Sequence, residues 1–413
     1  MAELISHRGS SVCRICNSQK LESILDLGSQ PLPAEYGRTP DEVMDVFPLH
    51  MRICPNCGLG QLGEYVLPER IFHQDYPYAS SASSTWVEHA RQYAKSMRQR
   101  LQLGNNSRSR VLELASNDGY LLSAFKALDI PVLGVEPANN VATIARDAGI
   151  PTLTKFFGAQ TASEILATYG HPRLIVANNV FAHIPDMHDF TKGMAILADD
   201  QTIITIENPS FTELLRRTLF DTIYHEHYSY LTAHSVREVA RAHELELVHV
   251  DQLTTHGGSN RYWLSKGGQI DETVDATLQA ERDAGLFDPE AWKAFADRAS
   301  SAIEGLRKWF NARRLAGDVV AGYGAAHKGN TFLNAVGDAS RVLVCVVDAS
   351  AEKQGKFLPG SQVPVLHPER LASANPTDVF ILPWNIAPEL ALEIRDLTPD
   401  ARIWVAHPDM QQL

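Results

Sequence analysis

The stretch VLELASNDGYLL, residues 111–122, contains an apolar strand pattern, a short polar loop that ends in glycine, and the start of a helix. Around it, from residue 110 to about residue 266, strand patterns alternate with amphipathic helix patterns. This alternation predicts an α/β fold with a mostly parallel sheet covered by helices on both faces. The last two strand patterns, LELVHVDQ and RYWLSK, flank the turn HGGSN and predict an antiparallel hairpin.

The loop LASNDG predicts a ligand site, because ligands of open α/β sheets lie at the carboxyl ends of the strands. Gly119 allows a ligand to approach the backbone closely. Glu136, at the end of the next strand pattern, can accept hydrogen bonds from two ribose hydroxyls. A dinucleotide fingerprint needs three glycines or small residues, and this loop has one glycine. The loop therefore disfavours NAD and suits S-adenosylmethionine (SAM), which has no pyrophosphate.

SAM also carries a cationic amino-acid end and a sulfonium, and polar side chains near the strand ends can bind both. Glu113 and Asp118 are the candidates for the cationic end, and the segment ANNVFAHIPD adds two asparagines and a histidine near the sulfonium. The full predicted cofactor-binding set is Glu113, Ala115, Asn117, Gly119, Glu136, Pro137, Asn178, Asn179 and His183.

Four cysteines form two CxxC pairs, Cys13 with Cys16 and Cys54 with Cys57. Two such pairs can present four thiolates to one tetrahedral Zn²⁺, so residues 1–70 are predicted to fold around a structural zinc ion. Two disulfides are the alternative, which an intracellular chain disfavours. The fifth cysteine, Cys345, lies in the apolar run VLVCVVD and is expected in a core.

Composition excludes several classes of partner. The net charge of −12 argues against an extended nucleic-acid surface, because phosphate binding requires a basic face. No stretch approaches the roughly 18 uninterrupted apolar residues of a membrane span. The N-terminal residues MAELISHRGSS contain no apolar signal region, so we expect a cytoplasmic protein without nucleic-acid or membrane partners.

The C-terminal part predicts a helical connector followed by a second α/β region. The connector has a break near GLFDPEAW, where Asp288 caps a helix whose first turn contains Pro289. After it, DVVAGYGAAHKGN, VLVCVVDAS, DVFILPW and ARIWVAHP are strand patterns separated by helices. The first of these has Gly322 and Gly324, but His327 occupies the third fingerprint position, so the NAD fingerprint fails.

The helix start after this loop suits a diphosphate, because free backbone donors, the helix dipole and a cation converge there. Lys328 supplies the cation, and Gly329, Asn330 and Thr331 follow it. An ordinary glycine-rich turn with a solvated lysine is the alternative.

The segment TIYHEHYSYL, residues 222–231, concentrates two imidazoles, a carboxylate and three phenols in one connection. This density beside a predicted sulfonium site favours catalysis over a histidine-rich surface loop. In an extended segment His225 and His227 would share one side and Glu226 would face the other, whereas a turn would break this parity. A metal site of His183, His225 and His227 is a further alternative.

The motifs CxxC…CxxC, DYPYASS, ELASNDGYLL, NNVFAHI, YHEHYSYL, GYGAAHKGNT and PWN occur in the order found in nucleotide-sugar C-methyltransferases. The chain resembles this family over nearly its whole length, although the family usually has a small residue in place of His327. The resemblance implies a class I, Rossmann-like methyltransferase domain flanked by an N-terminal zinc-binding domain and a C-terminal Rossmann-like domain. We expect domains of residues 1–70, 71–268, 269–315 and 316–413.

By motif match, the resemblance makes His227 the base that removes a proton next to the sugar ketone, a task for which neutral imidazole is suited. Glu226 is then expected to orient His227, and Tyr224 and Tyr76 to donate hydrogen bonds to the enolate oxygen. The implied substrate-binding set is Tyr78, His225, Lys328, Asn330, Thr331, Lys353, Lys356, Trp384 and Asn385.

We therefore expect a monomeric, SAM-dependent C-methyltransferase of an NDP-4-keto-6-deoxy sugar, with dTDP as the nucleotide and GDP or CDP as alternatives. Two other functions stay open at this point. One is an NAD-dependent nucleotide-sugar oxidoreductase or epimerase that uses the C-terminal glycines, and the other is a catalytically silent zinc-ribbon binding protein. The sequence does not distinguish methylation at C-3 from methylation at C-5.

Overall fold

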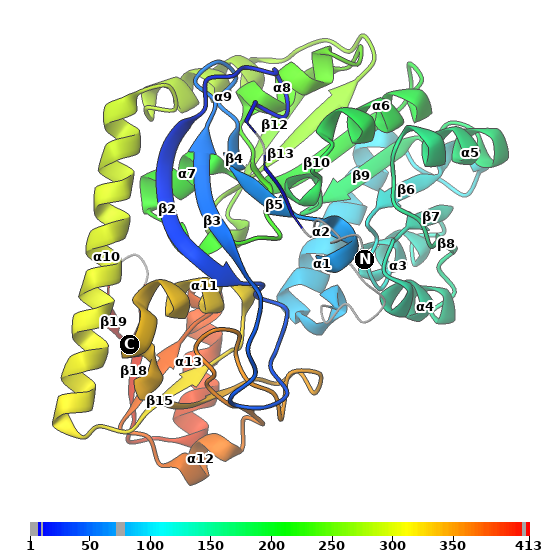
Figure 1. Cartoon of the computed structure of the whole chain (residues 1–413). Helices are drawn as coiled ribbons and strands as arrows, with labels where there is room; N and C mark the ends of the chain where they lie inside the picture. The colour runs from blue at the N-terminus through cyan, green and yellow to red at the C-terminus, as the bar shows by residue number, and fades with distance from the viewer. Residues whose placement is uncertain (1–6, 10, 72–78, 407–409) are drawn as a thin grey trace, which may run out of the picture.

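A computed structural model of the chain describes residues 7–9, 11–71, 79–406 and 410–413. It has a larger lobe around a seven-stranded sheet and a smaller lobe around a six-stranded sheet, with strands of a third, N-terminal sheet reaching from one to the other (Figure 1). None of the helices in the described ranges combines the length and apolar character that crossing a membrane requires.

The seven-stranded sheet has the order β12-β13-β10-β9-β6-β7-β8. Neighbours from β10 to β8 are parallel, whereas β13 pairs antiparallel with both β10 and β12, so the predicted parallel sheet and terminal hairpin are confirmed. The central strands are buried on both faces, which explains their continuous apolar runs. The strands are β6 (Val111–Leu114), β7 (Val132–Val135), β8 (Thr152–Leu153), β9 (Leu174–Asn178), β10 (Ile203–Pro209), β12 (Glu246–Leu253) and β13 (Ser259–Ser265).

Helices cover both faces of this sheet. Alternate residues of β9 enter two different cores: Val176 packs with Tyr93 of α2 and Phe125 of α3, and Ile175 packs with Ile165 of α5 on the other side. The helices of the lobe are α2 (Ser84–Leu101), α3 (Tyr120–Lys126), α4 (Asn139–Asp147), α5 (Ala159–Tyr169), α6 (Met187–Leu197), α7 (Phe211–Arg217) and α8 (Ala233–Arg241), with 3-10 turns η1 (Ser80–Ala82), η2 (Ser107–Ser109), η3 (Phe181–His183), η4 (Phe220–Thr222) and η5 (Thr255–Gly257).

The N-terminal sheet takes one strand from the larger lobe, which the sequence analysis did not anticipate. Its order is β11-β4-β3-β2, and β11 (Ser229–Tyr230) belongs to the histidine-rich segment. A Cβ on Gly60 of β4 would lie 2.8 Å from the Phe211 ring, so a glycine is needed where the two parts meet. The other N-terminal elements are β1 (His7–Gly9), β2 (Glu22–Pro31), β3 (Val46–Ile53), β4 (Gly60–Leu62), β5 (Glu64–Val66) and α1 (Pro68–Ile71).

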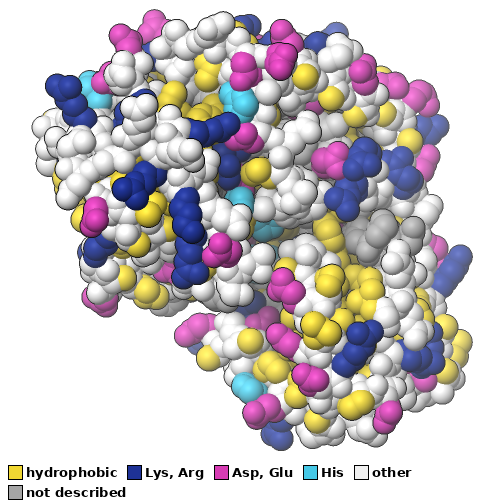
Figure 2. All heavy atoms as spheres, turned by 180° about the vertical axis from the view of Figure 1, so that it is seen from behind, with side chains coloured by type: hydrophobic (Ala, Val, Ile, Leu, Met, Phe, Trp, Pro, Cys, Tyr) yellow, Lys and Arg dark blue, Asp and Glu magenta, His cyan; other side chains and the backbone are white. Residues whose placement is uncertain are grey.

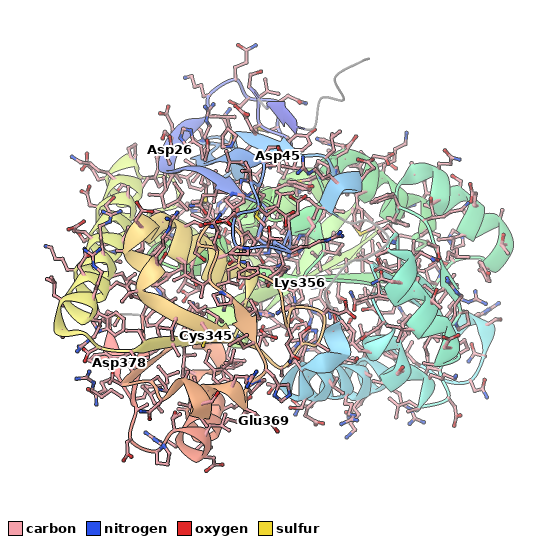
Figure 3. The ribbon with its side chains drawn as sticks, turned by 60° about the horizontal axis from the view of Figure 1, so that its bottom comes forward. Asp26, Asp45, Cys345, Lys356, Glu369 and Asp378 are labelled. Carbon is pink, nitrogen blue, oxygen red and sulfur yellow. The ribbon has the colours of Figure 1, made fainter. Side chains whose placement is uncertain are left out.

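The smaller lobe is the predicted second α/β region. Its strand order is β16-β15-β14-β17-β18-β19, parallel except for the last pair, and Cys345 on β15 is 2% exposed, as expected for a core residue (Figure 3). The elements are β14 (Val320–Tyr323), α11 (His327–Val336), η6 (Gly337–Val342), β15 (Leu343–Val347), β16 (Val365–Leu366), α12 (Arg370–Ala374), β17 (Asp378–Ile381), η7 (Trp384–Ile386), α13 (Ala387–Leu397), β18 (Arg402–Val405) and β19 (Gln411–Gln412).

Two helices, α9 (Glu272–Asp283) and α10 (Pro289–Ala316), connect the lobes. The predicted cap is confirmed, because the Asp288 carboxylate accepts a 3.0 Å hydrogen bond from the backbone N–H of Glu290. One apolar cluster contains Met51 of the N-terminal sheet, Phe295 of α10 and Phe380 of the smaller lobe. This shared core fixes the position of the smaller lobe relative to the N-terminal sheet.

Candidate active site

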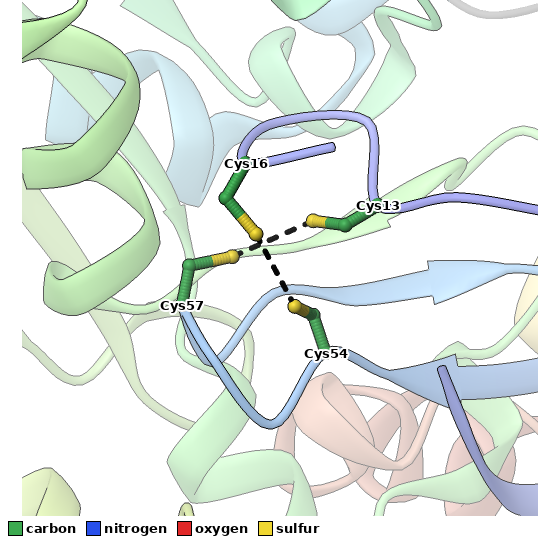
Figure 4. Close-up of side chains that lie close together, drawn as sticks. All are labelled: Cys13, Cys16, Cys54 and Cys57. Atoms are coloured by element: carbon green, nitrogen blue, oxygen red, sulfur yellow. Dashed lines mark hydrogen bonds between the residues drawn. The ribbon is translucent and has the colours of Figure 1, made fainter. Parts of the chain in front are cut away.

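The four paired cysteines converge on one point (Figure 4). Their sulfur atoms all lie within 4.8 Å of one another, and Sγ of Cys13 and of Cys16 lie 3.5 Å from Sγ of Cys57 and of Cys54, respectively. All four are free thiols, so the disulfide alternative is wrong. Zn–S bonds of about 2.3 Å in a tetrahedron separate the sulfurs by about 3.8 Å, so the cluster has the dimensions of a Zn²⁺ site.

The cysteine cluster is joined to the histidine-rich segment through Arg14, which lies between Cys13 and Cys16. The Arg14 guanidinium donates hydrogen bonds to the carbonyls of Tyr228 and Leu62 and to Oγ of Ser229. The backbone N–H of Leu62 donates a further 3.0 Å bond to the Tyr228 carbonyl. The metal-binding loop thus holds the end of the histidine-rich segment in place.

Residues 224–227 form a turn, closed by a 2.9 Å bond from the His227 N–H to the Tyr224 carbonyl. The parity of an extended strand therefore fails. His225 is directed away from His227: it is 1% exposed, and its Nε2 lies 3.0 Å from the Phe47 carbonyl in the N-terminal sheet. These contacts place His225 between the turn and the N-terminal sheet, and its expected role in substrate binding stays a prediction. They also exclude it from a three-histidine metal site, and the cysteines form the only convergent group of potential metal ligands within the described ranges.

The turn presents His227 as a neutral base. Its Nδ1 lies 3.0 Å from the Thr222 carbonyl, which can only accept, so Nδ1 carries the hydrogen. Its Nε2 is then an acceptor and lies 2.7 Å from the hydroxyl of Tyr224. Burial, reinforced by His183, lowers the pKa of His227 well below 6.5. His183 is also held by the turn, since its Nδ1 lies 2.6 Å from the Glu226 carbonyl and its ring meets His227 edge-on.

Glu226 does not orient His227, contrary to expectation. Its Oε2 lies 3.2 Å from Nδ1 of His327, the first residue of α11 in the smaller lobe. Burial raises the pKa of the Glu226 carboxyl, but the electrostatic interaction and hydrogen bond with His327 outweigh it, and the net shift is downward. The groups that orient His227 are the Thr222 carbonyl and the Tyr224 hydroxyl.

The predicted cofactor loop has a strained backbone. Ala115 and Asn117 adopt left-handed conformations with φ of 53° and 50°, followed by Gly119 at 78°. Asn179, after β9, also has φ of 53°. Left-handed conformations cost a residue with a side chain about 1 kcal/mol or more and cluster at ligand sites. Strain at both strand ends thus marks the same place as the sequence prediction.

The cofactor loop and the end of β9 contain buried carboxylate and amide oxygens. Some are anchored by backbone N–H groups, and others have no hydrogen-bond partner among the described residues. Both Glu136 carboxylate oxygens are anchored, by the N–H groups of Asn117 and Ala138 at 2.9 and 2.8 Å. Within the described part of the chain, buried side-chain oxygens without a hydrogen-bond partner include one each on Glu113, Asp118, Asn178 and Asn179. Burial, together with Asp118 and Glu136, raises the pKa of Glu113 well above its usual value. A ligand with a cationic group and several donors would satisfy these oxygens.

The candidate residues of the smaller lobe separate into two groups. The Lys328 ammonium lies 4.5 Å from the centre of the Trp384 ring and donates to Asn385, so these three residues are brought together. Asn330 and Thr331 are 1% and 2% exposed, and Asn330 donates to the Pro33 carbonyl of the N-terminal part. Both side chains are therefore buried within the chain, and their expected role in substrate binding stays a prediction.

Two lysines after β15 complete this set. Lys353 donates to the Ala325 carbonyl and lies 3.3 Å from the Asp348 carboxylate, so it stabilises the glycine-rich loop. Lys356 lies on the loop that follows β15 and is partly buried (Figure 3). The expected catalytic Tyr76 and substrate-binding Tyr78 lie outside the described residues.

A charged cluster at the end of β10 was missed by the sequence analysis. Glu207 is fully buried, and its carboxylate oxygens lie 2.5 Å from Nη2 of Arg261 and 2.9 Å from Nε2 of His89. The Trp86 ring stacks on the His89 ring, and its centre lies 5.2 Å from the centre of the His256 ring. The signal available was an acid at the end of a buried strand pattern, TIITIENP.

From behind, the surface is hollowed where the lobes meet, and histidine side chains are visible there (Figure 2).

Comparison with known proteins gives the family. Models described as "Putative zinc binding domain", "Methyltransferase domain" and "C-methyltransferase C-terminal domain" match residues 13–72, 86–250 and 254–406. The C-methyltransferase NovU of Streptomyces niveus is 32% identical over 383 residues, which are 92% of this chain and 90% of that protein. The chain belongs to the C-methyltransferase family. It is a SAM-dependent enzyme with a zinc-binding cysteine cluster.

Two solved structures that are similar to part of this C-methyltransferase each overlap with less than half of it. The magnesium protoporphyrin IX methyltransferase of Synechocystis PCC 6803 with bound SAH is 14% identical, with a TM-score of 0.35, and the overlap covers 48% of this chain and 92% of that one. A SAM-dependent methyltransferase of Anabaena variabilis is 14% identical, with a TM-score of 0.33, and the overlap covers 44% and 94% of the two chains. Such scores say nothing about the substrate of this C-methyltransferase.

The zinc site of the C-methyltransferase can be tested by metal content. We expect Cys57→Ser to lose about one Zn²⁺ per chain and to lower the melting temperature, because a structural zinc ion contributes directly to folding. Cys345→Ser, which lies outside the cluster, should keep its zinc. The measurement is elemental analysis of dialysed protein together with calorimetric melting. Stoichiometric zinc in Cys57→Ser would contradict the assignment.

His225 makes the stability of the C-methyltransferase dependent on pH. Burial lowers its pKa to about 4 in the folded protein, below the usual 6.5, so the unfolded chain takes up the proton first as the pH falls. Its contribution, about 3 kcal/mol, is complete above pH 6.5 and is lost as the pH falls toward 4. His225→Gln keeps a donor near the Phe47 carbonyl but cannot titrate. Its melting temperature should therefore fall less steeply than that of the wild type between pH 6.5 and 4.5; equal slopes would exclude this role.

Proposed function

We propose that this C-methyltransferase acts on the carbon next to the 4-keto group of a nucleoside-diphosphate deoxysugar, with His227 as the base. The arrangement of His227 and Tyr224 carries the proposal. An imidazole nitrogen without a hydrogen lies 2.7 Å from a phenolic hydroxyl. Enolate formation needs these two groups, one to take the proton from carbon and one to stabilise the charge on oxygen.

The proton-transfer step is explained by the tautomer of His227. The carbon–hydrogen bond of the sugar breaks, the proton goes to Nε2, and the electron pair forms the enolate. The Thr222 carbonyl holds Nδ1–H throughout, so the ring does not rotate. The Tyr224 hydroxyl must leave Nε2 for the proton to arrive, and the ketone oxygen is the acceptor to which it turns. The Tyr224 hydroxyl thereby changes its hydrogen-bond acceptor from Nε2 of His227 to the developing oxyanion.

The buried oxygens around the cofactor loop fit SAM. When bound, SAM supplies a methyl group on a positively charged sulfur, which the enolate carbon attacks. Glu136, anchored by two backbone N–H groups, is placed to accept hydrogen bonds from ribose hydroxyls. Glu113 has an unpartnered oxygen that can accept a hydrogen bond from the cationic amino-acid end, and such a cation would favour the ionised carboxylate, whose pKa burial otherwise raises. A cation there would also offset the cost of burying that carboxylate.

The smaller lobe supplies a handle for the diphosphate. Burial lowers the pKa of Lys328 to about 8, so a bound phosphate would strengthen its charge. Trp384, which lies beneath this ammonium, donates a 2.7 Å bond to Asp221, and Asp221 precedes the residue whose carbonyl anchors His227. The handle and the base are thus attached to the same short turn, η4. We propose dTDP as the nucleotide and a monomer as the active form.

The alternative functions find less support. In an NAD site of this fold, the acid that ends the second strand binds ribose. Here the equivalent acid, Asp348, accepts backbone N–H bonds from Ala325 and Ser350, as Glu136 does from its own loop, but it also binds the Lys353 ammonium, which takes up acceptor capacity that a ribose would need. Membership in an enzyme family argues against a silent zinc-binding protein.

The role of His227 can be tested with His227→Asn, whose amide can still donate to the Thr222 carbonyl. We expect loss of methyl transfer by at least about 100-fold, together with loss of deuterium uptake by the sugar in D₂O, because general bases contribute about 10² to 10⁴. Affinity for SAM should be unchanged in calorimetry. Turnover near that of the wild type would remove His227 from the reaction.

The role of Glu136 can be tested by direct binding. We expect Glu136→Gln to weaken SAM and SAH equally, by about 10-fold or more, because hydrogen bonds to a charged group contribute about 1.5–3 kcal/mol. Glu164→Gln, on the exposed face of α5, is the matched control and should bind both normally. Wild-type affinity in Glu136→Gln would place the ribose elsewhere.

A further inference from the structure

The Glu226–His327 pair connects the catalytic turn to the smaller lobe. Glu226 precedes His227, and His327 precedes Lys328. The pair is therefore flanked by the proposed base on one side and the proposed diphosphate handle on the other. The ring of His327 also lies 6.3 Å from the ring of Tyr224, edge to face, so the pair is close to the reacting groups.

Only one of the two Glu226 carboxylate oxygens has a hydrogen-bond partner among the described residues. Oε2 accepts from His327, but Oε1 is buried and has no hydrogen-bond partner within the described part of the chain. The residue is 2% exposed, so bulk water does not satisfy that oxygen. A buried carboxylate oxygen without a donor costs about 1–3 kcal/mol or more. A ligand that offers a hydroxyl hydrogen at this place would remove the cost, whereas a carbonyl or phosphate oxygen would be repelled.

The position of the pair selects one part of the sugar. The reacting carbon adjoins the ketone and must face His227, while the anomeric carbon carries the diphosphate and must face Lys328. With C-3 as the reacting carbon, carbon 2 lies between it and the anomeric carbon, and its hydroxyl faces the space between these two ends. His327 holds the carboxylate through a hydrogen bond at 3.2 Å, which keeps Glu226 ionised and its free oxygen directed away from His327.

We propose that Glu226 and His327 recognise the 2-hydroxyl of the nucleotide sugar, so that the enzyme selects 2-hydroxy substrates over 2-deoxy substrates. Glu226 accepts the hydroxyl hydrogen, and His327 is the positioning residue that orients the carboxylate. This specificity rests on the proposed function and adds the substrate subclass to it. A hydroxyl-binding site rejects the analogue that lacks the hydroxyl, because the buried acceptor is then left unpaired.

The experiment compares kcat/KM of the zinc-loaded enzyme for dTDP-4-keto-6-deoxyglucose and for its 2-deoxy analogue. We expect the wild type to prefer the 2-hydroxy sugar by about 30-fold or more. His327→Ala should reduce this preference to about 5-fold or less, mainly through KM for the 2-hydroxy sugar. His327→Asn, whose amide can replace Nδ1 as donor to Glu226, should restore most of it.

Each outcome decides the proposal. A wild-type preference near 1, or a preference that His327→Ala leaves intact, overturns the recognition of the 2-hydroxyl while methylation of both sugars upholds the proposed function. Methylation of neither sugar, with SAM bound normally, overturns the proposed function and this inference with it. Equal loss of kcat on both sugars in both variants would show that His327 supports the fold without reading the sugar, and would also overturn the proposal.

Discussion

The gathering of four sulfur atoms at one point is the constraint on which the histidine-rich segment depends. The two loops that carry the cysteines are short and add few apolar side chains, such as Ile15 and Leu59, to the core, so a common metal ligand would contribute much of the free energy that holds them together. Once the loops are fixed, the Arg14 guanidinium reaches the backbone carbonyl of Tyr228 in the histidine-rich segment. Strand β4 is then in register with β11. Four cysteine ligands leave a metal at this site no open position, yet the turn that carries His227 is attached to the cysteine loop through Arg14.

Burial gives the two histidines of this segment different tasks. His225 and His227 both have pKa values below 6.5 because the charged imidazolium is poorly solvated where they lie. His225 uses its hydrogen to bind a backbone carbonyl and has no contact with the reacting groups. His227 uses one nitrogen in the same way and keeps the other as an acceptor beside a phenol. Only the second arrangement leaves a nitrogen that can take a proton from carbon.

Sequence patterns were sufficient for features that depend on local order. The parallel sheet, its terminal hairpin, the Asp288 cap and the cysteine cluster all follow from residues that are close in sequence or from ligand chemistry. What the patterns did not specify were long-range contacts. The direction of Glu226 depends on His327, about a hundred residues away, and the burial of Asn330 depends on the Pro33 carbonyl. Whether a polar side chain binds ligand or another part of the chain is decided by folding partners that no local pattern specifies.

The apolar cluster shared by the N-terminal sheet, α10 and the smaller lobe has a consequence for protein engineering. Exchanging the smaller lobe, residues 316–413, between two relatives is the obvious way to alter the nucleotide that we propose Lys328 and Trp384 help to bind. In this architecture the exchanged piece would bring its own faces against Met51, Phe295 and Asp221 of the recipient. Functional chimeras will therefore require the surfaces that contact the other domains to be transferred along with the proposed binding residues, because the interface between the lobes also supports the site.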